Sequence, residues 1–288
     1  MQRTGRWLHW EPLLAVVLWG GIFPGAKIGL RDIPILDFTY LRIMLAAFLL
    51  LVVSGLGRWR ISPRPRLRAI VTAGLAQAAF QILLIAGLRW TTAGISAILL
   101  ASAPLLTTGW LALGRRERVS LGHWLGLGLG LAGVALVVRG AGMSLDRSRL
   151  LGDVLTLGAA GAWVWYSLAI APLVADAGAL RATGWAMAVS AIVFTPFGVV
   201  GVVRMPWTGV SWEAWAGLVY GATAGMVVAM ALWGRSVYRL GPKTTMLYAY
   251  LEPVSAVVIA AILLGERLTA LQAAGAVLTF AGVWCAAD

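Results

Sequence analysis

The sequence predicts an all-α integral membrane protein with ten transmembrane helices, built as two inverted repeats of five helices. Three observations support this fold class. Hydrophobic residues make up 60% of the 288 residues and charged residues only 12%, which is too apolar for a soluble protein of this size. The apolar stretches are continuous over about 20 residues, the length that spans a bilayer as a helix. The second part of the chain also repeats the first.

Ten apolar segments cover most of the chain. They do not alternate between polar and apolar residues, as the strands of a transmembrane barrel do, so we expect helices. The joining loops are short and contain Pro, Gly, Arg and Asp, and no soluble domain fits between the segments. The predicted segments are 12–30, 37–54, 69–88, 93–113, 121–138, 151–172, 182–203, 213–234, 243–264 and 269–287.

Basic residues in the loops predict the orientation. With ten crossings both termini lie on one side, and the loops of that side contain twice as many Lys and Arg residues as the opposite loops. Because cytoplasmic loops have this excess, we expect both termini in the cytoplasm. Most tryptophans, including Trp185 and Trp233, fall at predicted segment ends, as in an interfacial aromatic belt, whereas Trp19, Trp163 and Trp165 lie deep.

Composition and motifs exclude several function classes. The net charge of +12 is spread over loops between apolar segments, which argues against a nucleic-acid partner. Cys285 is the single cysteine, so neither an intrachain disulfide nor a cysteine metal cluster can form. A GxGxxG string lies inside an apolar segment, where Gly126 and Gly130 are better explained as a small-residue packing face. We expect no metal, no cofactor and no catalytic residues.

An internal repeat divides the chain into residues 1–145 and 146–288. A shift of 149 residues aligns Pro104 with Pro253, and Ala132-Gly133-Val134 with Ala281-Gly282-Val283, without a gap. Each part holds an odd number of segments, so the two parts insert with opposite topology. Inverted repeats are typical of secondary transporters, whose substrate site lies at mid-membrane where the repeats meet. The alternative is a duplication that only builds a stable bundle.

The repeated motifs resemble a known family. Tyr250-Leu251-Glu252-Pro253 and Leu264-Gly265-Glu266-Arg267-Leu268, with Arg116-Glu117-Arg118 in the first half, look like the EamA-type repeat of the drug/metabolite transporter superfamily. Within it, the length and the deep aromatic residues are most similar to YddG-type exporters of aromatic and neutral amino acids. The resemblance implies a basket of helices around a central cavity, with the fifth and tenth helices set apart as a peripheral pair. It also implies efflux across the bacterial inner membrane.

Polar and aromatic residues at helical spacing in the segment centres are the candidate residues of the substrate cavity. Aromatic rings offer a surface to apolar substrates and a face to an ammonium group, while amides and hydroxyls can bind a carboxylate or an amine. Each could instead be packing between helices. The candidates are Trp19 and Phe23 in the first segment, Gln77, Phe80 and Gln81 in the third, Trp163 and Tyr166 in the sixth, and Thr245, Tyr248 and Glu252 in the ninth.

Two equivalent prolines are the candidate hinges. Pro104 and Pro253 weaken the fourth and ninth segments at symmetric points, which suits rocking of one half against the other, although a static kink is the alternative. Glu252 has no partner in the first repeat, so it is the asymmetric addition and could bind substrate, titrate or form an ion pair. Lys27 and Arg42 lie near the outer ends of their segments, where they could snorkel to the interface or pair with an acidic group, and for both we favour a structural or gating role over substrate contact.

These observations predict a secondary transporter that exports aromatic and other neutral amino acids across the inner membrane by alternating access. The alternative within the same superfamily is an exporter of another small metabolite or a drug-like amine. A membrane-embedded enzyme or receptor is disfavoured by the repeat. We expect a monomer whose partners are its small-molecule substrate and the lipid bilayer. The sequence leaves open whether transport is coupled to protons.

Overall fold

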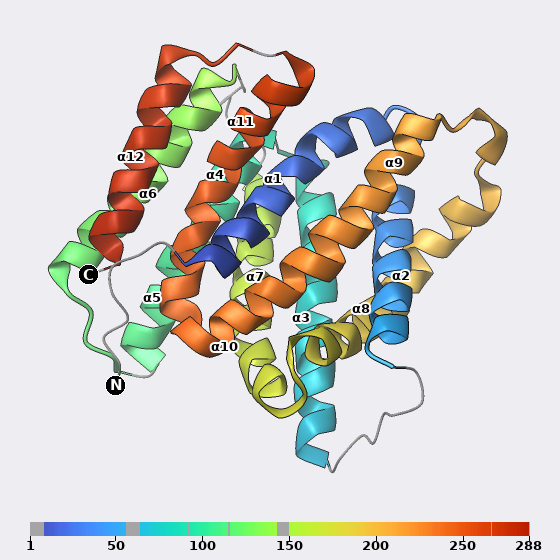
Figure 1. The fold of residues 1–288 in the computed structure, drawn as a ribbon, viewed down its shortest axis with the longest axis horizontal. Coiled ribbons are helices and arrows are strands. Elements are labelled where there is room, and N and C mark those ends of the chain that lie inside the picture. The colour runs from blue at the N-terminus through green and yellow to red at the C-terminus, as the bar shows by residue number, and fades with distance from the viewer. Residues whose placement is uncertain are drawn as a thin grey trace.

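The computed structural model describes residues 9–55, 64–91, 93–114, 116–142, 150–265 and 267–287. Within these ranges every regular element is a helix (Figure 1). The elements are α1 (Trp10–Gly29), α2 (Ile35–Val53), α3 (Arg64–Leu88), α4 (Ala93–Leu100), α5 (Ala103–Gly114), α6 (Leu121–Gly140), α7 (Leu150–Ala177), α8 (Ala179–Arg204), η1 (Trp207–Gly209), α9 (Trp212–Tyr220), η2 (Gly221–Val228), α10 (Ala229–Leu247), η3 (Tyr248–Tyr250), α11 (Leu251–Leu264) and α12 (Ala270–Ala286).

Seven helical stretches among the described residues are long and apolar enough to cross a membrane, and the chain is a multi-pass membrane protein. One of them, Trp212–Leu263, contains 52 residues, far more than the roughly 20 that one crossing needs. Two shorter apolar helices, Trp10–Ile22 and Ala270–Ala286, add to the seven.

The 52-residue stretch is broken near its middle. Gly241 has φ 81° and ψ 160°, a conformation that glycine adopts readily and other residues avoid. Pro242 follows, and proline is favoured in the first turn of a new helix because its missing N–H has no partner there anyway. The predicted end of the eighth segment at residue 234 is therefore wrong, because the helix continues to this glycine despite Arg235 and Arg239.

Both predicted hinge prolines follow an interruption of their helix. The chain leaves the helix between α4 and α5, where the Ser102 N–H bonds the Leu99 carbonyl and Pro104 is the second residue of the next helix. In the other repeat the 3₁₀-helix η3 precedes α11, in which Pro253 is the third residue. At both points the missing proline N–H falls in a first turn, where no intrahelical bond is lost.

α6 and α12 form a pair at one edge of the bundle (Figure 1), as the family resemblance implies for the fifth and tenth helices. Their backbones approach closely through glycine. A Cβ on Gly126 would lie 2.7 Å from the Gly282 carbonyl oxygen, and a Cβ on Gly133 equally close to that of Gly275. The order of these contacts makes the helices antiparallel. The packing role predicted for Gly126 and Gly130 is confirmed, since Gly130 meets the Tyr250 ring.

We predict opposite effects for two glycine substitutions in this pair. A Cβ on Gly282 would overlap the Gly130 backbone nitrogen, so Gly282→Ala should lower the free energy of unfolding by about 1–3 kcal/mol. A Cβ on Gly128 meets nothing within 4 Å, so Gly128→Ala should raise it by up to about 1 kcal/mol through helix propensity. Thermal melting in detergent measures both, and equal shifts would contradict the packing described.

The remaining helices pack across the two halves of the chain. α1 lies against α9, η2, α10 and α11, and in the same way α7 lies against α3, α4 and α5. α2 packs on α8, its equivalent in the repeat. The helices that begin the two repeats, α1 and α7, therefore each pack on helices of the opposite half, and both lie near the centre of the bundle in Figure 1.

Candidate functional site

Aromatic rings from both halves meet at this centre. The centroid of Trp163 on α7 lies 5.2 Å from that of Trp19 on α1 and 5.4 Å from that of Trp233 on α10. Trp163 also contacts Phe80 of α3 at 5.4 Å and stacks on Tyr166 at 5.3 Å. Trp19 and Trp233 complete a triangle at 5.1 Å. We refer to these five residues as the aromatic cluster.

Hydrogen bonds hold two of the indoles in place. The Trp19 indole N–H donates to the Gly225 carbonyl at 2.9 Å, and that of Trp233 donates to the Ser167 hydroxyl at 3.0 Å. Buried tryptophans require such partners. Gly225 belongs to η2, a π-helix of eight residues. π-helical turns are rare and are frequent at functional sites, so η2 adds to the reasons for treating this cluster as a candidate site.

The structure brings together four of the predicted cavity residues: Trp19, Phe80, Trp163 and Tyr166. The predicted glutamines are buried on α3 beside Phe80, with Gln77 1% and Gln81 5% exposed. The Gln77 side-chain oxygen is buried and makes no hydrogen bond to any described residue. The side chain of Phe23 lies outside the described residues.

The three candidates from the ninth segment do not join the aromatic cluster through any ring contact among the described residues. The 3₁₀-helix η3 interrupts the regular spacing that would align them on one face. Thr245 is fully buried, and its hydroxyl lacks a hydrogen bond to the described residues. The Tyr248 hydroxyl accepts the His9 backbone N–H at 2.8 Å, at the start of α1. Glu252 is partly buried in the first turn of α11.

Trp233 is the main site residue that sequence reasoning missed. The sequence predicts it in an interfacial belt, yet it is fully buried in the aromatic cluster. The error arises because the eighth segment is predicted to end at residue 234, just before Arg235, whereas the helix continues to Gly241 and Pro242. Trp185, also predicted at a segment end, is 7% exposed and packs against neighbouring helices.

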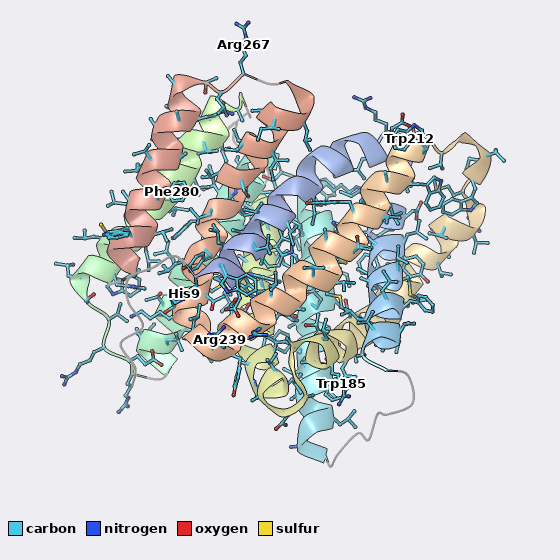
Figure 2. The ribbon with its side chains drawn as sticks, in the orientation of Figure 1. His9, Trp185, Trp212, Arg239, Arg267 and Phe280 are labelled. Atoms are coloured by element: carbon cyan, nitrogen blue, oxygen red, sulfur yellow. The ribbon has the colours of Figure 1, made fainter. Side chains whose placement is uncertain are left out.

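A buried carboxylate at the start of α1 was also missed. Glu11 has a side chain only 3% exposed, and its Oε1 lies 2.9 Å from Arg235 Nε and 2.6 Å from Arg239 Nη1. Both arginines are on α10 and are about half exposed. Together with the His9–Tyr248 bond, these ion pairs fasten the start of α1 to α10 and η3. We call Glu11, Arg235 and Arg239 the α1–α10 latch. Figure 2 shows His9 and Arg239 near each other.

At the end of the bundle opposite the α1–α10 latch, hydrogen bonds link the ends and starts of other helices. The Thr91 hydroxyl donates to Asp153 at 2.8 Å, which links the end of α3 to the start of α7. The Ser211 N–H donates to the Asp32 carboxylate at 3.0 Å, and its hydroxyl donates as well, which lowers the pKa of Asp32. α1 and α7 are equivalent in the repeat, so the Thr91–Asp153 bond corresponds in position to the α1–α10 latch.

Comparison with known proteins identifies the family. The sequence matches the EamA-like transporter family over residues 10–139 and again over residues 150–287. The chain belongs to the EamA-like transporter family. Family membership confirms the expectation of a transporter rather than an enzyme. Among the described residues, no group of three or more His, Cys, Asp or Glu side chains could hold a metal ion.

Relatives of this EamA-like transporter are distant in sequence. A "probable terminal-alkyne amino-acid exporter" of Streptantibioticus cattleyicolor is 27% identical over 95% of this chain and 91% of its own. A "probable amino-acid metabolite efflux pump" of Escherichia coli strain K12 is 27% identical over 94% and 92%. A solved crystal structure superposes with a TM-score of 0.78 at 18% identity, covering 96% of this chain and 95% of the other, and so shares the fold.

Proposed function

We propose that this EamA-like transporter exports amino acids, aromatic and other neutral ones, across the bacterial inner membrane by alternating access. The observation that supports this most is the aromatic cluster, because rings from α1, α3, α7 and α10 converge where the two halves of the chain meet. Rings of this kind can hold an apolar side chain and face an ammonium group. Two relatives whose names refer to amino acids and their metabolites support the same substrate class.

We further propose ten membrane crossings in two inverted repeats, with both termini in the cytoplasm. The break at Gly241 supports two crossings within Trp212–Leu263. The antiparallel packing of α6 and α12 supports inversion, because equivalent helices of inverted repeats run in opposite directions. Figure 2 is consistent with this topology, since Arg267 and Trp212 lie toward the upper edge, and Arg239 and Trp185 lie lower.

In this mechanism the aromatic cluster alternates between two exits. The α1–α10 latch closes the cytoplasmic exit, and the Thr91–Asp153 bond lies on the opposite side. Rocking of the halves about the helix interruptions before Pro104 and Pro253 would open one exit while the other stays closed. Glu252 lies just beside the second interruption, where it can respond to the movement.

Proteoliposomes test the proposal directly. Purified protein should exchange labelled phenylalanine and leucine, and Trp19→Ala should lower the rate at least about tenfold by removing a wall of the cluster. Trp10→Ala is the matched control on the same helix, because Trp10 is 61% exposed and should leave flux unchanged. Folded wild-type protein that moves no amino acid would refute the proposed substrate class.

A second candidate is export of a drug-like amine. The ring faces of the aromatic cluster would attract a cation without any carboxylate on the ligand. A competition series against labelled phenylalanine separates the two functions, since an amine exporter would be inhibited more strongly by amines than by the parent amino acids.

A further inference from the structure

Arg42 places a cation within a membrane-spanning helix. It belongs to α2, whose residues Ile35–Val53 form one of the apolar spans. Its Nε atom is buried and makes no hydrogen bond to any described residue. A charged side chain at this depth is costly, and such residues usually pair with another group or mark a substrate pathway. The residue as a whole is partly exposed, so its buried Nε is the part of the side chain that lacks a described partner.

The Arg42 side chain contacts η2, the π-helix that also accepts a hydrogen bond from Trp19 of the aromatic cluster. Its Cδ lies 2.7 Å from the position of a Cβ on Gly221, and its Nη1 lies 3.8 Å from it. Gly221 is the first residue of η2, and Gly225, one turn further, accepts the Trp19 indole N–H. Arg42 and Trp19 thus contact the same short π-helix about one turn apart, so η2 connects the Arg42 side chain to the aromatic cluster.

No described carboxylate neutralises this charge. Asp37 is the other charged residue described in α2, and its carboxylate lies against Gly201 of α8. Five residues separate Asp37 from Arg42, which is about 140° around a helix, so the two side chains leave α2 in different directions. Both ion pairs between described residues involve Glu11, at the start of α1, and neither includes Arg42.

We propose that Arg42 binds the carboxylate of the transported amino acid, while the aromatic cluster holds its side chain. The inference rests on the proposed function and names the group that recognises the substrate's anionic end. A guanidinium suits this task because it stays charged and can donate two parallel hydrogen bonds to one carboxylate. Arg42 is then a specificity residue, beyond the structural or gating role favoured from the sequence.

Substrates that differ only in the carboxylate test this assignment. Arg42→Gln should lower flux of labelled phenylalanine roughly 10- to 100-fold and leave flux of phenylalaninamide within about twofold of wild type. Arg42→Lys keeps the charge but loses the paired hydrogen bonds, so its phenylalanine flux should lie between that of the wild type and that of Arg42→Gln. Gly221→Ala should also lower phenylalanine flux, because the added Cβ would displace the aliphatic part of the Arg42 side chain. Arg204→Gln is the control, since Arg204 is exposed at the end of α8.

The possible outcomes separate carboxylate recognition from other roles of Arg42. Equal loss of phenylalanine and phenylalaninamide flux in Arg42→Gln overturns the inference. An effect that vanishes in vesicles of zwitterionic phosphatidylcholine also overturns it, because Arg42 would then act through the headgroup of a net-anionic lipid. If Arg42→Gln does not fold, competition in the wild type decides, because phenylalanine should compete at least about tenfold better than its amide. Wild-type protein that moves neither compound refutes the proposed function, whereas wild-type phenylalanine flux with no carboxylate preference refutes this inference alone.

Discussion

Replacing Glu11 with glutamine should release the start of α1 from α10. The Glu11 carboxylate is almost fully buried and faces two arginines within 3 Å, at 2.9 and 2.6 Å. Removing its charge should cost about 1–3 kcal/mol, less than the roughly 3–5 kcal/mol of a fully buried pair, because both arginines are half exposed. If the latch closes the cytoplasmic exit, this cost raises the population open to the cytoplasm by roughly 5- to 150-fold.

A single cysteine can report that opening. In a Cys285→Ser background, Thr245→Cys places a thiol at a fully buried position three residues before Tyr248, whose hydroxyl contacts His9. Glu11→Gln should raise its labelling rate by a membrane-impermeant maleimide about tenfold from the cytoplasmic face and leave labelling from the other face unchanged.

Glu117→Gln is the matched control for this latch experiment, because Glu117 is an exposed carboxylate in the loop between α5 and α6. It should change neither the melting temperature nor the labelling rate. Labelling that stays slow in Glu11→Gln, or that rises equally from both faces, would show that the ion pairs stabilise the bundle without controlling access.

Replacing Trp163 with alanine should be the most damaging change in the aromatic cluster. Its ring contacts four other rings, so its loss leaves a cavity that the rigid indoles around it cannot fill. We expect a loss of about 3–5 kcal/mol in the free energy of unfolding and loss of phenylalanine flux at permissive temperature. Thermal melting and proteoliposome exchange measure the two effects separately.

Trp165 provides the comparison two residues away on the same helix. It is 45% exposed at the outside of the bundle, so Trp165→Ala should lower stability by no more than about 1 kcal/mol and leave flux intact. Similar losses for the two variants would show that aromatic residues of α7 act through general membrane anchoring rather than through the cluster.

Much of the fold follows from the sequence because membrane helices are specified by local composition. Without water to satisfy backbone groups, an apolar stretch of about 20 residues is expected to be helical, so the approximate positions of the segments could be predicted. The small-residue face at Gly126 and Gly130 was predictable for a related reason, since glycines repeated along one side of a membrane helix permit close backbone contact.

The candidate site was less predictable where it depends on contacts between distant segments. Trp19, Phe80, Trp163 and Tyr166 were found because they lie deep and at helical spacing. Trp233 was missed because the nearby Arg235 and Arg239 suggest the end of a membrane segment. Both arginines instead form ion pairs with Glu11, a residue more than 200 positions earlier.

The sequence alone determined the class of protein, the approximate helix positions, the repeat and the deep aromatic residues, because hydropathy and spacing are local properties. Only the tertiary structure decided which rings touch, that Glu11 binds Arg235 and Arg239, and that Arg42 lies over η2 without a described carboxylate partner. These depend on the direction in which each side chain leaves its helix and on which helix lies opposite. Both are set by packing between the two halves.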